Sequence, residues 1–186
     1  MKVLIDTCAL FPTVMRETLL GAAAQGFFEP LWSARILEEW ARAAGSRIGP
    51  EAEVQARGEI ALLRASWPRA EVTFPPSLEA RLWLPDKNDR HVLAAAISGS
   101  ADVLLTLNRV DFPRNTLAEE GLIRQDPDSL LMGFHGQDAA RLRVACLKVL
   151  ETARRLSQSD WQMRPLLKKA RLPRLAKALA EERPLK

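Results

Sequence analysis

The sequence predicts an α/β fold: a three-layer α/β/α domain with a central parallel sheet, followed by an all-helical C-terminal extension. Two observations predict it. The first part of the chain alternates short apolar runs with stretches of helical spacing, a pattern typical of parallel sheets covered by helices. Beyond about residue 130 the apolar residues recur at helical spacing. We therefore expect an α/β domain over residues 1–130 and a helical extension over residues 131–186.

The expected strands are short apolar or β-branched runs bounded by turn-forming or polar residues. They cover residues 2–6, 71–74, 103–106 and 121–124.

The expected helices of the first part begin and end at capping residues. Pro12 lies in the first turn of a helix that ends at Gly26, and Pro50 opens a helix that runs to residue 66. Ser33 caps a helix through residue 44 that Gly45 closes. A further helix runs from residue 88 or 89 to about 99, and a short one begins at residue 115.

The C-terminal extension is expected to be helical and basic. Six apolar residues between 142 and 153 form one stripe, and Pro165 and Pro173 divide residues 160–182 into short helices. Lys and Arg number 14 against 19 Asp and Glu through residue 138, but 13 against 4 from residue 139 onward. An acidic body joined to a basic segment suits a polyanionic substrate. A solvated amphipathic helix surface explains the same charges.

Two classes of protein are disfavoured by composition. No apolar run approaches the roughly 20 residues of a membrane span, and the N-terminus is predicted to be a strand rather than a signal peptide, so we expect a cytoplasmic protein with no membrane partner. Cys8 and Cys146 are far apart in the sequence and form no Cys-x-x-Cys unit, which argues against a zinc site or a disulfide framework.

Four acidic residues carry the functional signal of this chain: Asp6, Glu39, Asp89 and Asp111. Each lies at or near the end of an expected strand or on a helix flank. Carboxylates at the carboxyl ends of parallel strands line the crevice where open α/β sheets bind their ligands. Several carboxylates together repel one another unless a hard cation such as Mg²⁺ or Mn²⁺ neutralises them.

The segments around these acids resemble a known family. LIDT at residues 4–7, ILEEW at 36–40, DKNDRHVLAAA at 86–96 and LTLNRVDFP at 105–113 are similar, in order and spacing, to the four signature stretches of the PIN-domain ribonucleases, particularly VapC-type toxins. The resemblance covers roughly residues 1–130.

The resemblance implies an endoribonuclease that depends on Mg²⁺ or Mn²⁺ and hydrolyses RNA phosphodiester bonds, leaving a 3′-hydroxyl and a 5′-phosphate. It implies catalytic roles for Asp6, Glu39, Asp89 and Asp111, of which Asp6, Asp89 and Asp111 would bind the metal. Because Mg²⁺ takes few protein carboxylates, we expect two or three direct ligands and another acid that orients water. A cognate antitoxin and a possible homodimer are the implied partners, besides the RNA substrate.

Neighbouring acids compete for two of these positions. On a helical wheel Glu39 lies about 110° and Glu38 about 150° from the centre of the apolar face, so Glu39 is closer to the core. The resemblance favours Asp89 over Asp86, because the family aspartate directly precedes the helix expected here. His91 has no Cys or second His near it in the sequence, and we expect a structural role rather than a general base.

Supporting residues are expected around the acids. Thr7 and Thr106 can donate hydrogen bonds to the carboxylates, and Asn108 can position them. The resemblance is incomplete at Asn108, because many members of the family have Asp at this position.

In the basic extension four residues are candidate RNA contacts. They are Arg154, Arg155, Lys168 and Lys169.

Two other functions are compatible with parts of the sequence. Asn108 favours a catalytically weak or inactive PIN-like module that binds RNA without cleaving it. The segment around Asp6 also faintly resembles the nucleophile strand of haloacid-dehalogenase phosphatases, but that fold requires a second Asp where this chain has Cys8.

Overall fold

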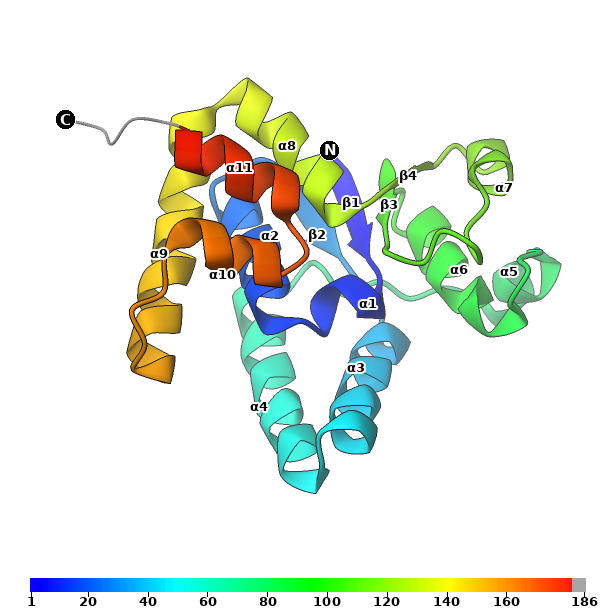
Figure 1. The fold of residues 1–186 in the computed structure, drawn as a ribbon. Coiled ribbons are helices and arrows are strands. Elements are labelled where there is room, and N and C mark those ends of the chain that lie inside the picture. Colours follow the sequence, from blue (N-terminus) through cyan, green and yellow to red (C-terminus); the bar gives the residue numbers. More distant parts are fainter. Residues whose placement is uncertain (182–186) are drawn as a thin grey trace. The chain divides into compact units, whose positions relative to one another are not determined.

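The computed structural model describes residues 1–181 and confirms the predicted fold class, an α/β fold followed by C-terminal helices (Figure 1). Its described strands form one parallel sheet in the order β2-β1-β3-β4. They are β1 (Lys2–Ile5), β2 (Glu29–Leu31), β3 (Val103–Leu105) and β4 (Ile123–Gln125). In the register of the sheet, Ile5 of β1 lies opposite Leu105 of β3. The carboxyl ends of these two central strands therefore meet at one edge.

The central strands are apolar because they are buried. Val3, Leu4 and Ile5 of β1, and Leu104 of β3, have no solvent exposure. Parallel strands that are covered on both faces read as continuous apolar runs, which is why both strands were predictable. Strand β2 was not predicted, since Glu29-Pro30-Leu31 is short and contains a proline. Proline is tolerated there because β2 lies at the edge of the sheet.

Contacts divide the chain into two compact units, of which the first holds residues 1–11 and 29–125. Its helices are α1 (Thr7–Leu10), α3 (Ala34–Arg47), α4 (Pro50–Ser66), α5 (Pro76–Arg81), the 3-10 turn η1 (Lys87–Asp89), α6 (Arg90–Ser98) and α7 (Arg114–Glu119). Ser33 caps α3 as predicted, because its Oγ accepts a hydrogen bond from the Ile36 amide at 3.2 Å.

Two local predictions for this unit were wrong. Gly45 does not close α3, which continues to Arg47. A Cβ at position 45 would meet the Glu53 side chain of α4, so this glycine permits a close approach of the two helices. The strand expected at residues 71–74 is reduced to a single bridge between Glu71 and Trp32.

The second unit holds residues 12–28 and the chain from residue 126 onward. Its helices are α2 (Thr13–Ala24), α8 (Pro127–Gln137), α9 (Ala139–Ser157), α10 (Met163–Lys169) and α11 (Pro173–Glu181). Gly21 of α2 packs against Ala145 of α9, and the Phe27 and Phe28 rings stack on Phe134. The early helix α2 thus packs with the C-terminal helices, and the division into domains at residue 130 stays a prediction.

The C-terminal end of the predicted last helix, Glu182, lies outside the described residues. No helix within residues 1–181 has the combined length and apolar character needed to cross a membrane.

Candidate active site

The carboxyl edge of the sheet places Asp6 beside Thr106. Asp6 follows β1 and Thr106 follows β3, and the Asp6 amide donates to the Leu105 carbonyl at 3.0 Å. The Thr106 hydroxyl donates to Asp6 Oδ2 at 2.7 Å. Asp6 is only 7% exposed. Pairing of two sequence-distant strands therefore fixes both the position and the orientation of this buried carboxylate.

A second donor to Asp6 is Cys8, which the sequence did not single out for the site. Its Sγ donates to Asp6 Oδ2 at 3.0 Å and accepts a hydrogen bond from the Leu107 amide at 3.1 Å. Burial, reinforced by the charge of Asp6, raises the pKa of the Cys8 thiol to about 12. The thiol therefore stays protonated at neutral pH and can act as a hydrogen-bond donor.

The charge of Asp6 is unfavourable in the metal-free protein. Burial raises the pKa of Asp6, and the nearby charge of Glu39 raises it further, although the hydrogen bonds from Cys8 and Thr106 oppose the shift. A buried carboxylate of this kind is a good candidate for neutralisation by a bound cation.

Glu39 on α3 points toward the residues next to Asp6. Its Oε2 accepts a hydrogen bond from Thr7 at 3.1 Å, and its Oε1 lies 2.8 Å from His91 Nε2 and 3.6 Å from Arg35 Nε. Burial raises the pKa of Glu39, but His91, Thr7 and Arg35 outweigh this effect and leave its pKa below the ordinary value. Glu39 is thus held as an anion.

Its neighbour Glu38 has a different environment. Its carboxylate is bound by the exposed Arg42 and Arg57, each at 2.9 Å. These hydrogen bonds lower the pKa of Glu38 to about 2. The two side chains are about equally exposed, at 37% for Glu38 and 38% for Glu39, so their contacts rather than their burial distinguish them.

His91, for which the sequence predicted a structural role, contacts an acidic residue of the site. It lies in α6, is fully buried and contacts the carboxylate of Glu39, at an angle away from that of a linear hydrogen bond. Within residues 1–181 its Nδ1 has no hydrogen-bond partner. The available sequence signal was its place two residues after Asp89, but spacing alone does not reveal a contact with a helix 52 residues earlier.

Asn108 joins the two remaining acids. Its Nδ2 donates to Asp111 Oδ2 at 2.7 Å and to Asp89 Oδ2 at 3.2 Å, and its Oδ1 accepts from the Asp111 amide at 3.3 Å. Burial raises the pKa of Asp89 to about 6, with further contributions from the charges of Asp6, Asp86 and Asp111. The acids are thus near enough to repel one another.

Asp86 has a local structural partner. Its Oδ1 accepts from the Asn88 amide at 2.8 Å and so caps η1, whereas the Asp89 side chain caps no helix. This difference is consistent with the preference for Asp89, although Asp86 adds to the local negative charge.

The chemistry of the acidic group fits a hard divalent cation. Asp6, Asp89 and Asp111 offer carboxylate oxygens, which Mg²⁺ and Mn²⁺ prefer, and their mutual repulsion would be relieved by a positive ion. In the described part of the chain no three His, Cys, Asp or Glu side chains already converge as a preformed metal site. Protein donors hold these carboxylates instead, chiefly Thr106, Cys8 and Asn108.

The four basic candidates belong to the second unit. Arg155, Lys168 and Lys169 are exposed, and Lys169 Nζ lies 5.1 Å from the Trp161 ring centroid. Arg154 is less exposed, and its Nε donates to the Trp161 carbonyl at 2.7 Å. Arg154 therefore has a structural role in the turn after α9.

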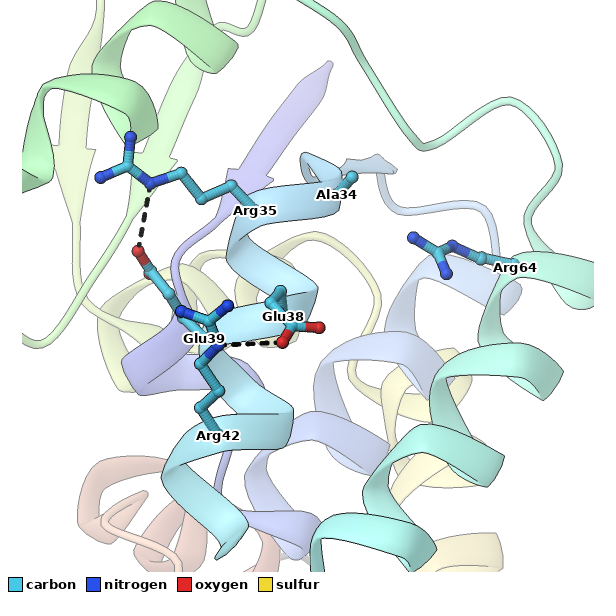
Figure 2. Close-up of a pocket in the computed structure, with 6 residues that line it drawn as sticks. All are labelled: Ala34, Arg35, Glu38, Glu39, Arg42 and Arg64. Atoms are coloured by element: carbon cyan, nitrogen blue, oxygen red, sulfur yellow. Dashed lines mark hydrogen bonds and ion pairs between the residues drawn. The ribbon is translucent and has the colours of Figure 1, made fainter. Parts of the chain in front are cut away.

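A pocket of about 580 Å³ lies along α3, close to Glu39 (Figure 2). It is lined by Ala34, Arg35, Glu38, Glu39, Arg42 and Arg64.

The family model described as PIN domain matches residues 2–110, which is more than half of the chain and includes Asp6, Glu39, Asp89 and Asn108. No curated protein and no solved structure matches the chain.

Proposed function

The chain belongs to the PIN-domain family, a family of nucleases, and on this premise we propose that it is a metal-dependent endoribonuclease that acts as a VapC-like toxin. The observation that carries the proposal is the crowding of carboxylates at the carboxyl edge of the sheet. Burial and the charges of Asp6, Asp86 and Asp111 raise the pKa of Asp89 to about 6. Such unrelieved repulsion is typical of sites that act with a cation bound.

PIN-domain proteins generally use divalent metal ions, and in this chain Asp6, Asp89 and Asp111 would hold Mg²⁺ or Mn²⁺. When bound, the ion would supply an activated water and stabilise the charge that develops on the phosphate. Thr106 and Cys8 orient Asp6, while Asn108 orients Asp89 and Asp111.

Glu39 is the residue that we assign to orienting the attacking water. Thr7 of α1 donates a hydrogen bond to one of its carboxylate oxygens, and His91 of α6 contacts the other. Its pKa below the ordinary value keeps it ionised and able to accept a hydrogen bond from water at neutral pH.

The test is RNA cleavage by wild type and Asp6→Asn. Sequencing of RNA ends after pulsed expression should reveal new 5′-phosphate ends for wild type and none for Asp6→Asn. A matched control is Asp102→Asn, because Asp102 is an exposed carboxylate next to the opposite end of β3, where it accepts a hydrogen bond from the Lys2 amide. Equal cleavage by wild type and Asp6→Asn at matched purity would overturn the assignment.

A toxin role adds a partner, the cognate antitoxin, which we propose from the family resemblance. Pulsed expression of wild type should arrest growth, and Asp6→Asn should not. Relief of this arrest by one co-expressed protein that binds the chain would identify the antitoxin. Cleavage of RNA without growth arrest would contradict the toxin role while leaving the nuclease role intact.

A second candidate function is an RNA-binding module with little or no cleavage. Asn108 is the observation that favours it, since an amide replaces a carboxylate at that position and reduces the negative charge available to a metal. RNA cleavage that depends on added Mn²⁺ separates the two functions.

A further inference from the structure

The pocket along α3 shares a wall with the proposed active site. Glu39 is one of the residues that line the pocket, and its carboxylate contacts Thr7 and His91 of the proposed active site. Figure 2 shows the Arg42 guanidinium between Glu39 and Glu38, Arg35 directed toward Glu39, and Arg64 across from them on α4. The volume of about 580 Å³ is in the range of sites that hold molecules of nucleotide size.

Three of the six residues that line the pocket carry guanidinium groups. The arginine side chains are exposed, Arg35 to 47%, Arg42 to 74% and Arg64 to 48%. Each forms an ion pair with a carboxylate at the surface. The pairs are Arg35 with Glu79, Arg42 with Glu38 and Arg64 with Glu71, at 3.1, 2.9 and 2.6 Å. Exposed ion pairs contribute little to stability, so these arginines can exchange their partners for another anion at small cost.

Arg35 connects the pocket to the acidic group. Its Nε lies 3.6 Å from Glu39 Oε1, and its Nη2 donates to the Asn88 carbonyl at 3.4 Å. Asn88 directly precedes Asp89 in the chain. An anion bound to Arg35 in the pocket would therefore lie next to two of the residues assigned to catalysis.

We propose that this pocket is a subsite for the RNA backbone, in which Arg35, Arg42 and Arg64 contact phosphates next to the bond that is cleaved. The proposal rests on the proposed ribonuclease function. The ligand class follows from the lining, because guanidinium groups bind phosphates through paired hydrogen bonds. A small apolar ligand or the apolar core of a protein interface would require hydrophobic and aromatic walls, and here Ala34 is the one apolar residue of the lining.

Glu38 acts against such binding, and this gives the proposal a test of opposite sign. Its carboxylate is held ionised by Arg42 and Arg57 and occupies a guanidinium that a phosphate could bind. Neutralising Glu38 should therefore tighten RNA binding, whereas neutralising the arginines should weaken it.

The experiment is a titration of a fluorescently labelled single-stranded RNA oligonucleotide, read by anisotropy at 50 and 200 mM salt. The protein carries Asp6→Asn so that RNA is not consumed. Arg35→Gln, Arg42→Gln and Arg64→Gln should each weaken binding about three- to tenfold at the lower salt. Each should also reduce the salt dependence of log K by about 0.7, because one phosphate contact is lost. Glu38→Gln should tighten binding about two- to fivefold.

Two control variants separate local contacts from overall charge. Arg81→Gln removes an arginine outside the pocket lining that forms a similar surface pair, with Glu120 at 2.8 Å. Glu29→Gln removes an exposed carboxylate at the amino end of β2, at the sheet edge opposite to Asp6. Both should change affinity by less than twofold, and thermal unfolding of every variant should match that of the parent.

The proposal is overturned if the pocket variants bind RNA like the parent, or if no RNA binding is measurable. It is also overturned if Arg81→Gln weakens binding as much as the pocket variants do, or if Glu29→Gln tightens binding as much as Glu38→Gln does. Pocket variants that bind RNA normally but lose a partner protein also overturn it. Because binding is measured on Asp6→Asn, its outcome is independent of cleavage. If wild type does not cleave RNA but RNA binding depends on the arginines, the ribonuclease function is contradicted and the RNA-binding role of the pocket is retained.

Discussion

Replacing Asp89 by Asn should stabilise the metal-free protein. A rise of the Asp89 pKa from its ordinary value of 3.8 to about 6 corresponds to about 3 kcal/mol of unfavourable free energy when the carboxylate is ionised. Because Asp89 is only partly buried, screening by solvent reduces this to about 1–2 kcal/mol. Asparagine keeps the shape of the side chain and can still accept the hydrogen bond from Asn108, but it carries no charge.

The stabilisation should depend on pH in a defined direction. The pKa of this acid is raised on folding, so the folded state binds its proton more tightly than the unfolded state. Its unfavourable contribution is therefore small below pH 4, grows between pH 4 and 6, and is complete above the folded-state pKa of about 6. Asp89→Asn should accordingly gain about 1–2 kcal/mol at pH 7.5 and a few tenths at pH 4.

The assay is thermal unfolding in EDTA at both pH values. At pH 7.5 the melting temperature of Asp89→Asn should exceed that of wild type by about 2–8 °C. Added Mn²⁺ should raise the melting temperature of wild type and leave that of the variant nearly unchanged, because a ligand that binds the folded state stabilises it. A loss of stability at pH 7.5, or an equal gain at both pH values, would refute the charge-repulsion argument.

Three further predictions concern other parts of the chain. In a cleavage assay, Glu39→Gln should reduce RNA cleavage at least 100-fold, and Glu38→Gln should change it less than threefold. The reason is that Glu39 contacts Thr7 and His91, whereas Glu38 pairs with exposed arginines. Reversed effects would assign the catalytic role to Glu38. Asp128→Ala should destabilise the second unit by about 1–3 kcal/mol in urea unfolding. The buried Asp128 carboxylate accepts hydrogen bonds from the first backbone amides of α11 at 2.9 and 3.0 Å. Unchanged stability would contradict this capping role. Charge reversal of the exposed basic residues of the extension should weaken RNA binding and flatten its salt dependence, whereas affinities within error of wild type would mean that this surface does not bind RNA. The variant carries Arg155→Glu, Lys168→Glu and Lys169→Glu, and it keeps Arg154 for its bond to the Trp161 carbonyl.

Parts of the fold could be predicted because local sequence and tertiary environment agree. Apart from Lys2 at the start of β1, the residues of β1 and β3 are apolar and lie in the centre of the sheet, and Ser33 caps α3 with its own hydroxyl. Strand β2 could not be predicted, because it exists through its pairing with β1 rather than through the propensity of Glu29-Pro30-Leu31. The prediction that Gly45 ends α3 was wrong for a similar reason. A glycine is present there because α4 packs against α3 at this position, and not because the helix ends.

The candidate site shows the same division. The positions of the acidic residues, together with the resemblance of their segments to the PIN family, singled out Asp6, Glu39, Asp89 and Asp111 without any knowledge of their partners. The contacts of Cys8 and His91 depend on which helix and strand ends lie together in space, over separations of 98 residues for Cys8 and Thr106 and 52 for His91 and Glu39. No periodicity in the sequence reports such contacts. The pocket was missed because Arg35, Arg42 and Arg64 come from two helices whose packing forms it.

The amide of Asn108 keeps the acidic group stable without metal, and Asn108→Asp should expose this effect. Asn108 Nδ2 donates to Asp111 and Asp89, so aspartate would replace two favourable contacts with carboxylate repulsion and raise the pKa of Asp89 further above 6. In EDTA at pH 7.5 the variant should lose about 1–3 kcal/mol of stability, yet Mn²⁺ should raise its melting temperature more than that of wild type, because an added carboxylate strengthens cation binding. Asn108→Ala is the control, since it removes the donors without adding charge and should lose stability in EDTA without the larger response to Mn²⁺. If Asn108→Asp and Asn108→Ala respond equally to Mn²⁺, position 108 lies outside the charge group that a metal would neutralise.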